Sequence, residues 1–107
     1  MNIVVDAMGG DHAPENIVAG VVEAVKEYNL IVTLIGIEAR VQTELKKYSY
    51  PQDRIEIFHA PEVVEMHDPA ISSIRQKKNS SITLGVNLVK EFPQKYDAFI
   101  SAGNTGA

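Results

Sequence analysis

The chain alternates between segments with strand-like and helix-like patterns of apolar residues. Short runs rich in valine and isoleucine are separated by stretches in which apolar residues recur every three or four positions, the spacing of an amphipathic helix. Strands separated by helical crossovers favour a mostly parallel sheet with helices on both faces and right-handed connections. The sequence therefore predicts an α/β fold, with strands at 2–5, 31–35, 54–59 and 97–100.

Prolines and small polar residues mark the expected helix ends. Pro14 suits a first helical turn, and the pattern that follows reaches Tyr28. A second helix is expected over 38–48. A short third helix should begin at Asp68 as N-cap with Pro69 in its first turn, ending near 77–79. The last expected helix is capped by Ser80 or Ser81 and reaches about Phe92, where Pro93 stops it.

Size and composition limit the function classes. The 107 residues suffice for one modest core, and a net charge of −4 without a basic stripe argues against nucleic-acid binding. The lack of cysteine excludes disulfides and cysteine nucleophiles within these residues, and no leader-like or transmembrane stretch is visible, so a cytoplasmic location is expected. Because the chain stops at Ala107, just after a loop that looks like a helix entry, we interpret 1–107 as a single partial domain, the amino-terminal part of a longer protein.

The first candidate site is the loop after the first strand, residues 6–14. Gly9 and Gly10 allow positive φ and a close approach of a ligand to the backbone. Asp11 and His12 offer acid, base or orienting groups, since histidine titrates near neutral pH. The alternative is a simple helix-capping turn, with Asp11 as the cap and His12 merely exposed.

The second candidate site is the loop after the last strand, residues 101–107. Small residues beside hydroxyl and amide groups at a strand end suit the binding of an oxyanion. The alternative is a plain strand-to-helix turn. The carboxyl ends of parallel strands meet at one edge of a sheet, so both loops could face one crevice that binds phosphate or another small anion. The candidate binding residues here are Ser101, Gly103, Asn104, Thr105 and Gly106.

A basic cluster, residues 75–81, precedes the last expected helix. It holds Arg75, Lys77 and Lys78, followed by the hydroxyls of Ser80 and Ser81. Three interpretations remain open. Lys78 and the serines complete an anion site, or the cluster docks an acidic partner by charge, or the lysines are solvated at the negative end of a helix.

Other kinds of site are less well supported. His59 and His67 flank two glutamates, Glu62 and Glu65, but their spacing fits no known ligand pattern, so we expect no metal. The phosphate loop Gly-x-x-x-x-Gly-Lys-Ser/Thr and the dinucleotide pattern Gly-x-Gly-x-x-Gly are both absent. A phosphatase with Asp6 as nucleophile is a rival, weakened by Met8 standing where such enzymes usually carry a second acid.

Four blocks of the sequence together resemble the bacterial phosphate acyltransferase family, the transacylases that act between acyl carrier protein and phosphate. They are IVVDAMGGDHAPE at 3–15, EVVEM at 62–66, the basic cluster, and SAGNTGA at 101–107. The blocks fall in the family's order along the whole chain. The departure from the family is length, since its members are roughly three times as long.

The resemblance implies transfer of a fatty acyl group from acyl carrier protein to inorganic phosphate, giving an acyl phosphate for phospholipid synthesis. It also implies a fold like those of isocitrate dehydrogenase and phosphotransacetylase, incomplete in this chain, with no cofactor, a homodimer at full length and peripheral membrane association. The residues that match are then expected to act as follows. The catalytic groups are Asp11, His12, Lys78 and Asn104, and the phosphate or substrate ligands are Gly9, Gly10, Ser80, Ser81, Gly103, Thr105 and Gly106.

Overall fold

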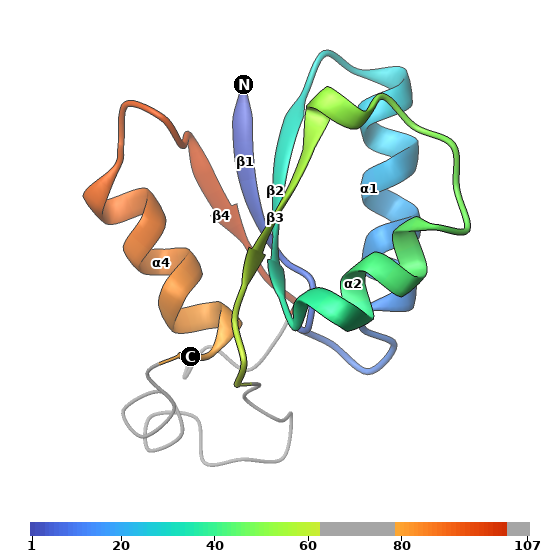
Figure 1. Cartoon of the computed structure of the whole chain (residues 1–107). Coiled ribbons are helices and arrows are strands. Elements are labelled where there is room, and N and C mark those ends of the chain that lie inside the picture. The colour runs from blue at the N-terminus through green and yellow to red at the C-terminus, as the bar shows by residue number, and fades with distance from the viewer. Residues whose placement is uncertain (63–78, 103–107) are drawn as a thin grey trace.

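The computed structural model describes residues 1–62 and 79–102 (Figure 1). Within them, four strands form one all-parallel sheet in the order β3-β2-β1-β4. The predicted α/β class with a parallel sheet is confirmed. The strands are β1 (Asn2–Asp6), β2 (Ile31–Gly36), β3 (Ile55–His59) and β4 (Ala98–Ile100).

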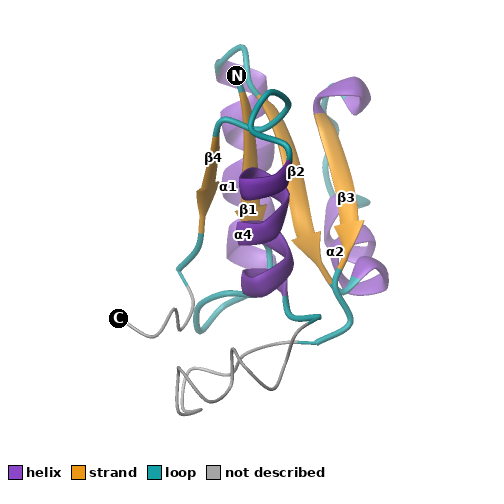
Figure 2. Cartoon of the chain, turned by 90° about the vertical axis from the view of Figure 1, so that its left-hand side faces the viewer, coloured by secondary structure: helices purple, strands orange, loops and turns teal. Residues whose placement is uncertain are grey.

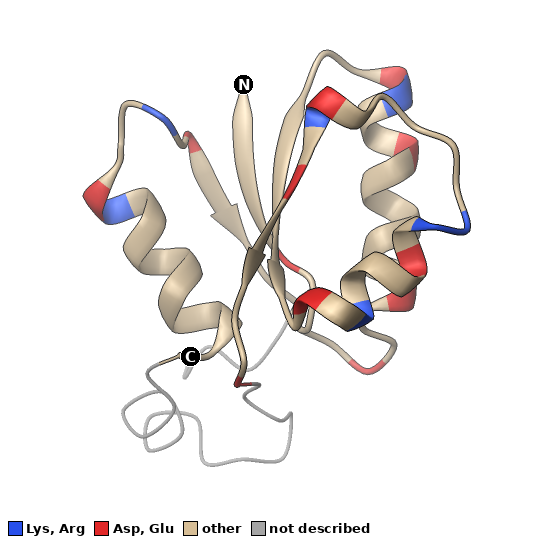
Figure 3. Cartoon of the chain, in the orientation of Figure 1, with Lys and Arg blue, Asp and Glu red and all other residues tan. Residues whose placement is uncertain are grey.

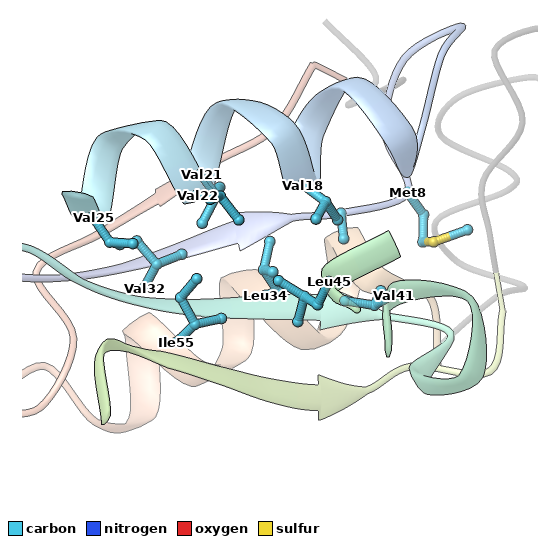
Figure 4. Packing of buried hydrophobic residues seen from close by; sticks show 11 residues of the cluster. Met8, Val18, Val21, Val22, Val25, Val32, Leu34, Val41, Leu45 and Ile55 are labelled. Atoms are coloured by element: carbon cyan, nitrogen blue, oxygen red, sulfur yellow. The ribbon is translucent and has the colours of Figure 1, made fainter. Parts of the chain in front are cut away.

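Helices cover both faces of this sheet, as predicted. Helices α1 (Glu15–Glu27) and α2 (Glu38–Leu45) lie on one face and α4 (Ser81–Glu91) on the other (Figures 1 and 2). Each face has its own core. The larger core lies under α1 and α2, and its side chains point toward one another from helix and sheet (Figure 4). The smaller core joins α4 to the sheet through Val4, Ile35, Ala60, Leu88 and Tyr96.

Local signals placed both ends of α4 correctly. Ser80, rather than Ser81, is the N-cap of α4, since its hydroxyl accepts a hydrogen bond from the Thr83 N–H at 3.2 Å. The helix ends at Glu91, just before Phe92 and Pro93, as expected. The helix predicted to start at Asp68 lies outside the described residues.

Several boundaries differ from the prediction, and β1 and β2 each end one residue later than predicted. Pro14 is the N-cap of α1 rather than part of its first turn, and exposed Tyr28 lies just past its end. Helix α2 stops at Leu45, and beyond it the amides of Lys47 and Tyr48 donate to carbonyls three residues back, those of Glu44 and Leu45. A short 3₁₀ helix (Gln52–Arg54) takes the residue where the third strand was expected to begin. The last strand begins at Ala98, one residue later than predicted.

Thr33, in the middle of β2, carries a buried hydroxyl with no hydrogen-bond partner among the described residues. A buried polar group without a partner costs stability, and valine has nearly the same shape. We expect Thr33→Val to leave the free energy of unfolding unchanged or raise it by up to about 1 kcal/mol. Urea unfolding measures this; a loss of more than about 1 kcal/mol would mean that the hydroxyl has a partner.

Candidate functional site

The side chain of Asp6 joins the two candidate loops. Asp6 ends β1, and its carboxylate is buried, with the residue only 1% exposed. One oxygen, Oδ1, accepts the Met8 N–H at 2.9 Å within the first loop. The other, Oδ2, accepts the Ser101 hydroxyl at 2.7 Å at the start of the terminal loop. A single carboxylate therefore holds groups from both ends of the described chain.

The backbones of the two loops also lie next to each other. Gly10 has φ +94°, a conformation that side-chain-bearing residues rarely adopt. A Cβ added there would stand 3.6 Å from the Cβ of Ala102, an ordinary van der Waals distance. The two loops were predicted to be able to face one crevice at the carboxyl edge of the sheet, and the described parts of both loops do lie side by side there.

Asp11 and His12 are exposed beside this junction. The alternative in which Asp11 caps α1 is wrong, because Pro14 is the N-cap and no side chain bonds there. The backbone carbonyl of His12 accepts the Asn16 N–H at 3.0 Å, which connects the loop to the first helical turn. Both side chains are thus accessible to a ligand above the loop, and their catalytic roles stay predictions.

The start of α4 is built differently. Ser80 is fully buried, and its hydroxyl both accepts the Thr83 N–H and donates to the Thr83 hydroxyl at 3.1 Å. Glu62 links this helix start to the end of β3: its carboxylate accepts the Asn79 N–H at 3.0 Å, and its own N–H donates to the Asn79 carbonyl at 3.2 Å. Sequence reasoning missed this link, because 17 residues separate Glu62 from Asn79.

Several predicted site residues lie outside the described residues: Lys78, Gly103, Asn104, Thr105 and Gly106, together with Arg75, Lys77, Glu65 and His67. Charge near the described part of the site is mainly acidic. Figure 3 shows red segments at the carboxyl edge of the sheet, whereas most blue segments of the described chain lie elsewhere. An anion held there would need the backbone N–H groups or cations from the remaining residues.

Comparison with known proteins confirms the resemblance to phosphate acyltransferases that the four sequence blocks indicated. A family model described as "Fatty acid synthesis protein" matches residues 1–107. The chain belongs to this family. Proteins named phosphate acyltransferase are 52% identical in Alkaliphilus oremlandii, 51% in Halothermothrix orenii and 49% in Dictyoglomus thermophilum, each over the whole of this chain. The chain spans only 31–32% of the length of these relatives.

For a member of this family, the burial of Asp6 bears on the rival phosphatase reading. A carboxylate nucleophile must reach the phosphorus atom of its substrate, but Asp6 is 1% exposed and both of its oxygens already accept hydrogen bonds. Its two oxygens instead hold the Met8 N–H and the Ser101 hydroxyl in place. The geometry thus disfavours Asp6 as a nucleophile.

Other features of this family member lie apart from the loops. His59 accepts the Glu38 N–H through Nδ1 at 3.1 Å, and no cluster of three possible metal ligands occurs among the described residues. The pKa of exposed Lys47 is raised, first by its hydrogen bond to Glu44 and then by that carboxylate's charge.

None of the helices in the described parts of the chain could span a membrane. A mostly apolar groove of about 300 Å³ runs between α1 and strands β1 and β4, lined by residues including Val5, Ile17 and Ile100.

Proposed function

We propose that the protein containing this chain transfers a fatty acyl group from acyl carrier protein to inorganic phosphate, giving an acyl phosphate for phospholipid synthesis. The observation that carries the proposal is the match along the entire chain to proteins named phosphate acyltransferase. The meeting of two glycine-containing loops at the carboxyl edge of a parallel sheet supports it, because small anions are commonly bound there.

The proposed chemistry is direct attack. A phosphate oxygen attacks the thioester carbonyl carbon, a tetrahedral oxyanion forms, and the C–S bond then breaks to release the carrier's thiolate, which takes up a proton. The site must position a dianion and stabilise the oxyanion. The reaction requires no covalent enzyme intermediate.

Roles for individual groups follow from their chemistry. Asn104, Thr105 and the N–H groups of Gly103 and Gly106 would hold phosphate or the oxyanion, and the glycine pair Gly9 and Gly10 would let the ligand approach the first loop. Lys78 would supply charge. Ser80 and Ser81 were predicted as further ligands, but both are buried, and the single hydroxyl hydrogen of Ser80 is donated to Thr83. Since the Ser80 hydroxyl caps α4, its more direct contribution is to fix the start of that helix. Asp11 or His12 would orient groups or protonate the leaving thiolate.

Partners and assembly belong to the same proposal. The acidic acyl carrier protein would dock on the basic residues 75–78 by charge. At the length of its relatives the protein would form a homodimer in the cytoplasm and associate peripherally with the membrane. The active protein would extend well past Ala107, since the chain spans about a third of its relatives.

The deciding experiment measures acyl phosphate formation from a long-chain acyl carrier protein and inorganic phosphate. The protein at the length of its relatives and the 107-residue chain are assayed side by side. We expect activity in the longer protein only, and phosphate binding without turnover as the most that the shorter chain retains. A longer protein that makes no acyl phosphate but hydrolyses simple phosphate esters would overturn the proposal in favour of a phosphatase.

In that longer protein, Lys78→Ala or Asn104→Ala should lower turnover at least tenfold, about 1.4 kcal/mol of transition-state stabilisation. The reason is the loss of a charge or a donor where negative charge develops. Steady-state kinetics at varied phosphate concentration provide the measurement. Lys90→Ala, which removes an exposed lysine from the last turn of α4, is the matched control. Unchanged turnover in both test variants would remove these residues from the mechanism.

A further inference from the structure

We infer that Asp6 is a positioning residue, which sets the geometry of the phosphate site by holding the first loop against the terminal loop through Ser101. The inference rests on the proposed function. It assigns Asp6 neither the role of nucleophile nor that of a plain core residue.

The strand register explains why these two residues meet. Strand β4 pairs with β1 through Ile3–Ala98, Val4–Phe99 and Val5–Ile100, and the strand pairing stops there. The next position in register would be Asp6 opposite Ser101. Neighbours in register on parallel strands project to the same face of a sheet, so the two side chains meet just where the strand pairing ends. Their hydrogen bond at 2.7 Å prolongs the contact between the strands by one residue.

Because Asp6 is buried, its carboxylate depends on hydrogen bonds from neighbouring residues. A carboxylate that is 1% exposed needs hydrogen-bond donors, and the described residues supply the Met8 N–H and the Ser101 hydroxyl. Hydrogen bonds to an ionised group are shorter and stronger than neutral ones. On its other side, Asp6 is in register with Ile35 of β2, and the Ala7 N–H donates to the Ile35 carbonyl at 2.9 Å. Asp6 is thus held firmly by the sheet, and Ser101 is held by Asp6.

The consequence for the proposed reaction is geometric. Most of the groups proposed to bind phosphate are divided between two loops, and the described links between these loops include the Asp6–Ser101 hydrogen bond and the close approach of Gly10 to Ala102. Ser101 directly precedes the loop that holds Asn104 and Thr105. Since misplacing a catalytic group by about 1 Å can cost a hundredfold in rate, losing the Asp6–Ser101 contact should impair phosphate use without removing any group that touches phosphate.

The test uses the longer protein with Asp6→Asn, Ser101→Ala and the double variant, assayed for kcat and for the KM of phosphate. Ser101→Ala should reduce kcat/KM for phosphate about tenfold. Asp6→Asn should have a smaller effect, because the amide oxygen can still accept the Met8 N–H while the amide N–H₂ donates to Ser101. The double variant should be about as impaired as Ser101→Ala alone, since both changes act on the same contact and Ser101→Ala already removes it. Thr33→Val is the control for a change inside the same sheet.

The outcomes separate the two levels of inference. A wild-type protein without acyl phosphate formation defeats the proposed function itself. An active wild type in which the two single effects multiply in the double variant, or in which Ser101→Ala changes nothing, overturns the positioning role alone. Variants that only unfold at lower urea concentration, with kcat and KM unchanged, would assign the contact to stability and likewise overturn it. Complete loss of activity in Asp6→Asn with wild-type kinetics in Ser101→Ala would point to direct chemistry by Asp6, also contradicting the inference.

Discussion

Replacing Gly10 with valine is expected to lower the rate of acyl phosphate formation in the longer protein about hundredfold, while the sheet still forms. At φ +94° a β-branched residue is strained by about 1–3 kcal/mol, and the loop can relieve that strain only by moving. Space is not the obstacle, since a Cβ at this position would make an ordinary contact with Ala102. Movement of the first loop would then displace it from the terminal loop.

Two further variants isolate the backbone as the cause. Gly10→Asn should retain much more activity than Gly10→Val, because asparagine adopts positive φ more readily than other side-chain-bearing residues. Gly20→Val, at an exposed position in α1 with no atom within 4 Å of an added Cβ, should leave the rate unchanged. Initial rates and circular dichroism are compared for all three. Equal activity of the valine and asparagine variants at position 10 would contradict the backbone explanation.

Gly85→Ala is expected to lower the free energy of unfolding by about 2–3 kcal/mol. A Cβ at Gly85 would lie 2.2 Å from Cε1 and 2.7 Å from Cδ1 of Phe99, far closer than packed carbons allow. The ring of Phe99 packs against the smaller core, so either it or α4 must shift. The strain falls on β4, whose end leads directly to Ser101.

The same substitution elsewhere provides the control. Gly20→Ala should raise the free energy of unfolding by about 0.5–1 kcal/mol, because alanine is the better helix former and the space is open. Adding Phe99→Leu to Gly85→Ala should recover part of the loss by making room. Urea unfolding of the four proteins gives the comparison. A Gly85→Ala variant as stable as wild type would show that the ring moves aside at no cost.

Much of the secondary structure could be predicted because its signals are local. Ser80 starts α4 through a hydrogen bond to a residue three positions away, and Pro93 stops it because proline cannot continue a helix. Short apolar runs of strand length identified the strands. The misplaced boundaries, such as the end of α2 at Leu45, fall where a turn competes with the helix over one or two residues.

The candidate site was predicted only in part. Both loops were recognised from glycines that follow strands, and Asp11 was mistaken for a possible cap because aspartate is a common one. The sequence suggested Asp6 only as the nucleophile of a rival phosphatase mechanism. Its actual surroundings, with one bond two residues away and the other to Ser101, could not be deduced from either segment alone.

The sequence by itself determined the α/β class, the positions of the strands and most helix starts, and the family to which the chain belongs. These follow from periodicity, capping residues and motifs that act over a few positions. Only the tertiary structure decided the strand order β3-β2-β1-β4 and the meeting of Asp6 with Ser101, which are 95 residues apart. The physical reason is that any parallel strand can pair with several others, and the choice among them depends on how the helices pack over the completed sheet.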